Sequence, residues 1–113
     1  EATSEKVSMG WHLDGRASAV IGTHTHVPTA DERILPDGTA YLSDVGMTGC
    51  YNSVLGMEKD KVLKRFLHQV PERFEPATGP AVLCGAIIDI DENTGRSRSI
   101  DRVTINERRY PAS

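Results

Sequence analysis

The chain has 113 residues, a formal net charge of −3 at pH 7 and only 5% aromatic residues. Its length is enough for one small domain, so we interpret residues 1–113 as a single domain with a thin, aliphatic core. The mild negative charge gives no support for a protein that coats nucleic acid, because such proteins are basic. No apolar run approaches the roughly 18 residues of a membrane span, so the sequence predicts no membrane contact.

The first half of the chain predicts a helix, a strand and a hairpin, in that order. We expect the helix over residues 3–14. The apolar run at 17–22 predicts a strand that is buried on both faces. Two short strands at 32–35 and 39–43 flank the turn at 36–38 and predict a β-hairpin.

The second half predicts one more helix and a pair of long strands. A glycine-rich loop is expected at 44–49, and an amphipathic helix at 57–69. An irregular link at 72–79 leads to strands at 81–91 and 96–106, which we expect to pair antiparallel, with a bulge where the alternation of the second strand breaks. This order predicts an α/β fold class with antiparallel C-terminal strands.

His24 and His26 follow the predicted strand at 17–22 directly. Two side chains two residues apart, where a strand ends, point to the same side. Imidazole is the commonest metal ligand among side chains, and such a pair can give one ligand to each of two metals. The pattern favours metal-dependent hydrolysis, although two histidines do not complete a metal site.

Four neighbouring residues are candidates for supporting this site. The hydroxyl of Thr25 can fix the loop by hydrogen bonds to the backbone. Asp31 and Asp44 can orient imidazoles, although carboxylates also serve in ordinary turns. Gly46 can let backbone N–H groups approach a phosphate, or it can simply be part of a mobile connection.

The two cysteines, Cys50 and Cys84, lack the spacing of a metal or redox motif. Small secreted domains use more cysteines at this length. We therefore expect two reduced thiols in a cytoplasmic protein.

Several stretches, in register, resemble the YmdB-type metallophosphoesterases of the calcineurin-like superfamily. The matching stretches are Glu1 to Lys6, Gly22 to Val27, Thr29 to Leu35, Gly38 to Tyr41, Asp44 to Gly49 and Phe66 to Pro76. The resemblance extends to about Asp91. Cys50 departs from it, because family members usually carry proline there.

The resemblance implies a four-layer α/β/β/α sandwich with a mixed sheet and two metals, iron or manganese, in its cleft. It implies hydrolysis of phosphodiesters, most of all 2′,3′-cyclic nucleotides, by a metal-activated hydroxide. By position, His24 would bind one metal and His26 the other. Thr25, Asp44 and Gly46 would lie beside the substrate or orient the ligands.

In family members the remaining metal ligands precede these residues. We therefore interpret the chain as the C-terminal portion of such an enzyme, whose partner is the missing N-terminal half, and we expect the isolated portion to be inactive. A second hypothesis is a non-catalytic module that serves regulation or homo-oligomer contacts. A free-standing metal-binding protein would need further ligands, such as Asp31, Asp44 or His12.

Overall fold

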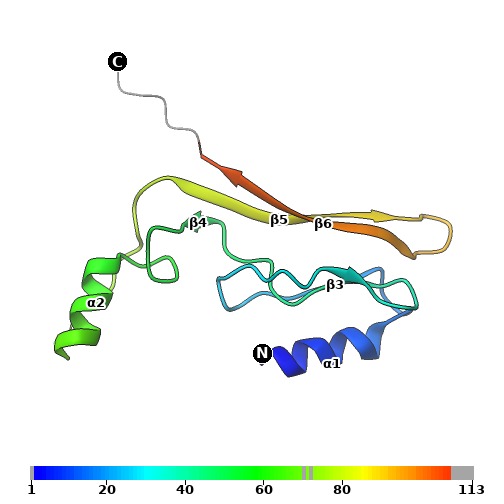
Figure 1. The fold of residues 1–113 in the computed structure, drawn as a ribbon, viewed down its shortest axis with the longest axis horizontal. Helices are drawn as coiled ribbons and strands as arrows, with labels where there is room; N and C mark the ends of the chain where they lie inside the picture. Colours follow the sequence, from blue (N-terminus) through cyan, green and yellow to red (C-terminus); the bar gives the residue numbers. More distant parts are fainter. Residues whose placement is uncertain (1, 70, 72, 108–113) are drawn as a thin grey trace, which may run out of the picture.

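The computed structural model describes residues 2–69, 71 and 73–107, and these residues form two helices and two three-stranded sheets (Figure 1). The first half of the chain forms α1 (Thr3–Leu13), β1 (Ala19–Ile21), β2 (Arg33–Ile34) and β3 (Ala40–Leu42). The second half forms β4 (Gly49–Cys50), α2 (Lys59–His68), β5 (Ala81–Ile90) and β6 (Ser97–Asn106). Neither of the described helices is long and apolar enough to cross a membrane.

The first sheet has the strand order β1-β3-β2 and is mixed. β1 runs parallel to β3, and β2 runs antiparallel to it, so Ala40 lies between Ala19 and Ile34. The turn at 36–38 joins β2 to β3, which confirms the predicted hairpin. The parallel neighbour places the C-terminal end of β1, where the histidines begin, beside the C-terminal end of β3.

The second sheet has the order β4-β5-β6 and is antiparallel throughout. The predicted pairing of the two long strands is confirmed, with Leu83 opposite Ile105. The register shifts between Asp89, which pairs with Ser99, and Ile90, which pairs with Ser97, so the extra residue, Arg98, lies in β6. The prediction of a bulge in the second strand is confirmed, although the bulge lies before the point where the alternation breaks. β4 begins at the last residue of the predicted 44–49 loop. The predicted link at 72–79 is irregular where it is described, but residue 72 lies outside the described residues.

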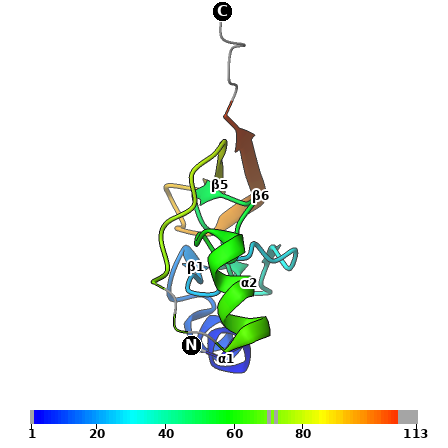
Figure 2. The same ribbon diagram turned by 90° about the vertical axis from the view of Figure 1, so that its left-hand side faces the viewer.

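The core lies between the two sheets. Ala40 and Leu42 of β3 are buried against Ile100 of β6, and Ala86 and Ile88 of β5 pack around them. The other face of the first sheet is covered by α1, and the three layers follow one another from α1 to the long hairpin (Figure 2). The α/β class is therefore confirmed, with two small sheets.

Two apolar segments are less buried than their patterns predict. β1 is shorter than the predicted strand at 17–22, and Ile21 is 37% exposed. The prediction of burial on both faces was wrong, because no residue of β1 is fully buried. The apolar side of α2 is likewise open, with Phe66 81% and Leu67 68% exposed.

The contact between α1 and β3 requires a residue without a side chain at Gly10. A Cβ there would lie 2.6 Å from the ring of Tyr41, which is itself buried. We expect Gly10→Ala to lower the free energy of unfolding by about 1–3 kcal/mol, although alanine favours helices, because the ring must move. Urea denaturation measures this. Ser8→Ala, at an exposed position of the same helix, is the matched control, and equal effects of the two substitutions would contradict the packing argument.

Candidate functional site

The histidine loop, residues 23–27, leaves the first sheet where β1 and β3 end together. Beyond β1, Gly22 donates its N–H to the Leu42 carbonyl at 2.8 Å, and its own carbonyl accepts the N–H of Val45 at 2.9 Å. A Cβ at Gly22 would lie 1.8 Å from the carbonyl oxygen of Ser43. Glycine is therefore required where the histidine loop begins, because another residue would push the two backbones apart.

The histidine loop is sharply bent. His24 and His26 have φ angles of 105° and 69°, in the region that non-glycine residues rarely adopt. The prediction that both histidines follow the alternation of an extended strand was therefore wrong. Both side chains are exposed at the surface.

Asp44, which follows β3, holds the histidine loop in this shape. Its side chain is fully buried. Oδ2 of Asp44 accepts hydrogen bonds from the backbone N–H of Thr25 at 2.8 Å and from its hydroxyl at 2.7 Å. The same Thr25 hydroxyl accepts the N–H of Val27 at 3.2 Å, so the predicted role of Thr25 in the loop is confirmed. The carboxylate therefore fixes Thr25, the residue between the two histidines.

Lys6 of α1 is the third part of this network. Its ammonium group lies 3.2 Å from Oδ2 of Asp44 and donates to the carbonyl of Thr23 at 2.6 Å. The Lys6 side chain is only 13% exposed. Sequence reasoning missed Lys6 and placed it only in the first turn of a helix. The sequence did contain a signal: Lys6 lies four residues before Gly10, and this spacing places both on the same side of α1, which faces the sheet.

The environment of Asp44 favours its charged form. Burial alone would raise the pKa of this carboxyl group. The hydrogen bonds from Thr25, the backbone N–H of Gly46 and Lys6 outweigh burial and lower the pKa to about 2. The carboxylate therefore stays ionised across the physiological pH range.

His26 is held from a second direction. Its Nδ1 lies 2.9 Å from the carbonyl oxygen of Leu55, which belongs to the loop between β4 and α2. Leu55 was not singled out by the sequence, because a backbone carbonyl leaves no signature in residue type. One imidazole of the pair is thereby tied to a segment 29 residues further along the chain.

Gly46 and Asp31 have structural roles in this arrangement. Gly46 has a φ of 86°, and its N–H donates to Oδ1 of Asp44 at 2.9 Å, so this N–H is already engaged. Asp31 accepts hydrogen bonds from the hydroxyl of Thr29 at 2.7 Å and from the backbone N–H and hydroxyl of Ser43. These bonds tie the segment after the histidine loop to the end of β3.

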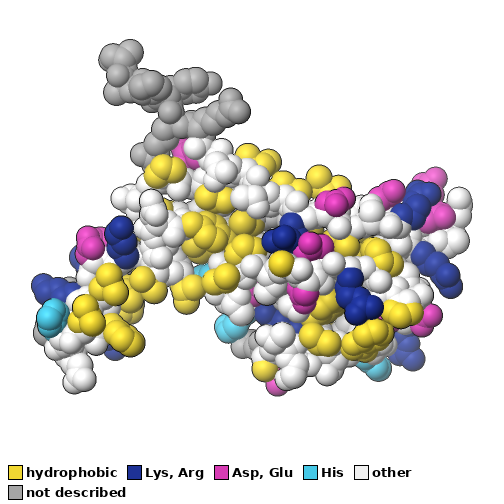
Figure 3. Space-filling view, viewed as in Figure 1, with side chains coloured by type: hydrophobic (Ala, Val, Ile, Leu, Met, Phe, Trp, Pro, Cys, Tyr) yellow, Lys and Arg dark blue, Asp and Glu magenta, His cyan; other side chains and the backbone are white. Residues whose placement is uncertain are grey.

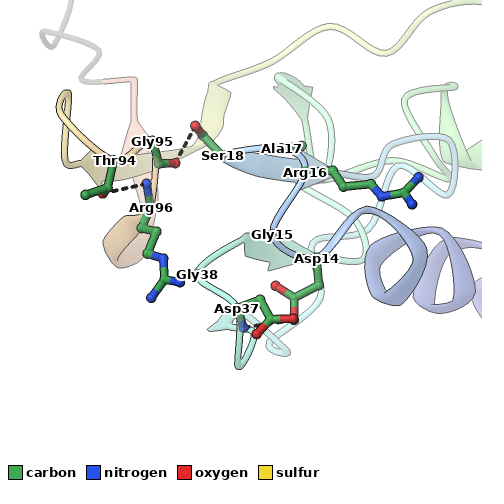
Figure 4. A pocket seen from close by; sticks show the side chains of 10 residues that line it. All are labelled: Asp14, Gly15, Arg16, Ala17, Ser18, Asp37, Gly38, Thr94, Gly95 and Arg96. Atoms are coloured by element: carbon green, nitrogen blue, oxygen red, sulfur yellow. Dashed lines mark hydrogen bonds between the residues drawn. The ribbon is translucent and has the colours of Figure 1, made fainter.

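The described residues contain no group of three or more His, Cys, Asp or Glu side chains that could hold a metal. The two imidazoles fit a metal by the chemistry of their donor atoms, but they are two ligands of a larger set. A polar pocket of about 410 Å³ lies elsewhere, at the N-terminal end of β1 (Figure 4). Turns that contain Gly15, Gly38 and Gly95 form it, so it lies away from the histidine loop.

Known proteins resemble this chain closely. A model of the YmdB-like protein family matches residues 1–103. The 2′,3′-cyclic-nucleotide 2′-phosphodiesterase of Bacillus subtilis strain 168 is 57% identical over 107 residues, which are 95% of this chain and 40% of that protein. A hypothetical protein from Thermus thermophilus has a TM-score of 0.87 at 47% identity, covering 96% of this chain and 42% of the other. A novel phosphatase from Mycoplasma pneumoniae has a TM-score of 0.87 at 39% identity, covering 95% of this chain and 38% of the other.

The fold and the site define an α/β protein that presents a histidine pair where a strand ends. The chain belongs to the YmdB-like family, which confirms the family resemblance found in the sequence. It spans about two-fifths of the length of the relatives described above.

Replacing Asp44 tests the network around the histidine loop. We expect Asp44→Asn to lower the free energy of unfolding by about 2–4 kcal/mol. Lys6 would lose its charge partner, and the NH2 group of the asparagine would face donors whose hydrogen bonds the carboxylate now accepts. Chemical denaturation gives this value. Asp101→Asn, at an exposed position of β6, should change stability by less than about 0.5 kcal/mol. A mild effect of both substitutions would show that Asp44 does not hold the loop.

The lowered pKa of Asp44 also predicts a pH dependence. The unfolded chain takes up the proton near pH 4, whereas the folded protein does so only near pH 2. The contribution of the ionised group is therefore fully present above pH 4 and is lost as the pH falls towards 2; it is on the order of 2 kcal/mol. Urea titrations at pH 6 and pH 3 measure it. Asp44→Asn should flatten this dependence, and an unchanged slope in that variant would contradict the assignment.

Proposed function

We propose that this chain supplies part of a dinuclear-metal phosphodiesterase that hydrolyses phosphodiesters, with 2′,3′-cyclic nucleotides as the substrate class. The observation that carries the proposal is the histidine loop, fixed through Thr25 by a buried carboxylate, in a chain of the YmdB-like family. The name of the relative from Bacillus subtilis supports the substrate class.

In this proposal His24 ligates one metal ion and His26 the other. Two bound ions, iron or manganese, would activate water and offset the charge of the phosphoryl oxygens. The residues of the chain contribute ligands and their orientation: Asp44 fixes Thr25, and Thr25 fixes the histidines on either side of it. Thr25 and Gly46 would border the bound phosphodiester.

The remaining ligands would come from a portion that precedes the chain, as an N-terminal half of the same domain. The relatives are more than twice as long as the matched residues, which supports this arrangement. The described layers, α1 and two sheets, would then be three layers of a four-layer α/β/β/α sandwich. The free thiols of Cys50 and Cys84 support our placement of the protein in the cytoplasm.

One observation favours a second candidate function, a module for assembly or regulation. Hydrophobic side chains lie exposed along β5, β6 and α2 (Figure 3). On the sheet, Leu83 is 46%, Ile87 63% and Ile105 57% exposed. Surfaces of this kind are usually covered by protein. A homo-oligomer would cover them, as would the rest of a longer domain.

Activity assays separate these functions. We expect the whole protein to hydrolyse bis-p-nitrophenyl phosphate and 2′,3′-cyclic AMP with Mn²⁺ present. His24→Ala or His26→Ala should each lower kcat/KM by more than about 100-fold, because an ion loses a ligand. His12→Ala, at an exposed position of α1, should leave activity unchanged.

The isolated 113-residue chain should show no turnover, because two imidazoles do not retain a metal pair. Metal analysis of the whole protein should find about two ions per chain. A protein without metal and without turnover would instead favour the assembly module. Turnover by the isolated chain that is lost on His24→Ala would contradict the division of ligands proposed here.

A further inference from the structure

The loop between β4 and α2 contains a tight turn with an unusual residue in it. Val54 and Met57 exchange two backbone hydrogen bonds of 2.9 Å each, so Leu55 and Gly56 form a two-residue hairpin loop. Both central residues have positive φ, 50° at Leu55 and 95° at Gly56. Asn-Gly is the usual choice for such a turn, and leucine is disfavoured in its first position. A strained residue of this kind is a reason to ask what its conformation achieves.

Bonds on both sides fix this turn. The Ser53 hydroxyl donates to the carbonyl of Cys50 at 2.6 Å and accepts the N–H of Gly56 at 2.9 Å. The carbonyl of Gly56 accepts the N–H of Ala77 at 2.7 Å. The turn is therefore attached to β4 on one side and to the segment before β5 on the other, and the carbonyl of Leu55 is directed at His26.

The contact between Leu55 and His26 determines which ring nitrogen can bind a metal. The Leu55 oxygen, 2.9 Å from Nδ1 of His26, has no proton to give. Nδ1 must therefore carry the proton. A neutral imidazole has a single lone pair available for coordination, and here it is on Nε2.

We propose that the turn at residues 53–57 is a positioning element of the metal site: the Leu55 carbonyl binds Nδ1–H of His26 and commits Nε2 to the metal. This inference rests on the proposed function, since it needs His26 to be a ligand. Metal-bound histidines commonly donate their second N–H to a carbonyl, which fixes both the tautomer and the ring plane. Leu55 thus acts through its backbone, and its strained conformation aims the oxygen.

The tautomer of His26 is the first test, made on the whole protein. Long-range ¹H–¹⁵N spectra of the metal-free protein should show His26 protonated at Nδ1. Titration with Zn²⁺, which is diamagnetic, should shift the Nε2 resonance of His26 and leave Nδ1 protonated. Protonation at Nε2 in the metal-free protein, or coordination through Nδ1, would overturn the inference while leaving the proposed function standing.

Variants of the turn provide the second test. Ser53→Ala should weaken Mn²⁺ binding at one of the two sites about 10-fold in calorimetry, because the turn loses its internal bridge. Leu55→Asn keeps the carbonyl and suits a positive φ, so it should bind Mn²⁺ as the unaltered protein does. Ser8→Ala, on the exposed side of α1, is the matched control for Ser53→Ala.

The outcomes of the binding test separate the two claims. Equal Mn²⁺ affinities in Ser53→Ala and Ser8→Ala would overturn the role of the turn. Loss of binding in Leu55→Asn, with its fold intact by circular dichroism, would also overturn it, because the carbonyl is unchanged. A protein that binds no metal at all would overturn the proposed function itself, and this inference with it.

Discussion

The buried carboxylate of Asp44 is the constraint on which the site depends. It accepts hydrogen bonds from Lys6 of α1, from Thr25 of the histidine loop and from the backbone N–H of Gly46. The loop contains two non-glycine residues with positive φ, and each such residue costs about 1–2 kcal/mol. That shape persists because Thr25, between them, gives two hydrogen bonds to one oxygen of Asp44. The positions of both imidazoles therefore follow from a carboxylate that acts on the residue between them.

Sequence reasoning succeeded where a pattern is local and failed where neighbours decide. The hairpin of β5 and β6 is visible in the alternation and the turn, and the helices were found to within two residues of their ends. The prediction that β1 is buried on both faces was wrong, because burial depends on which elements pack over a strand and not only on the strand's own residues. Lys6 and Leu55 were missed, since a lysine in a first turn and a backbone carbonyl look the same whether or not they reach a site.

The outer face of the second sheet carries apolar side chains like its inner face, but it is exposed to solvent. The inner face contributes Ile88 and Ile100 to the core, whereas Leu83 and Ile105 form a cross-strand pair that is open to solvent. A sheet that is apolar on both faces is normally covered on both. In the proposed enzyme this face would lie against another layer of the domain, so the same surface that suggests assembly is compatible with catalysis.

The spread of the Asp44 contacts along the sequence has a consequence for the order of folding. The β5–β6 hairpin closes a short loop, and local closures of this kind have a low entropic cost and are fast. The contact of Lys6 with Asp44 joins residues 38 positions apart and needs α1, β1 and β3 already in place. The histidine loop should consequently acquire its shape only after α1 has packed against the first sheet, so that the two imidazoles are not held in place before this contact between distant residues has formed.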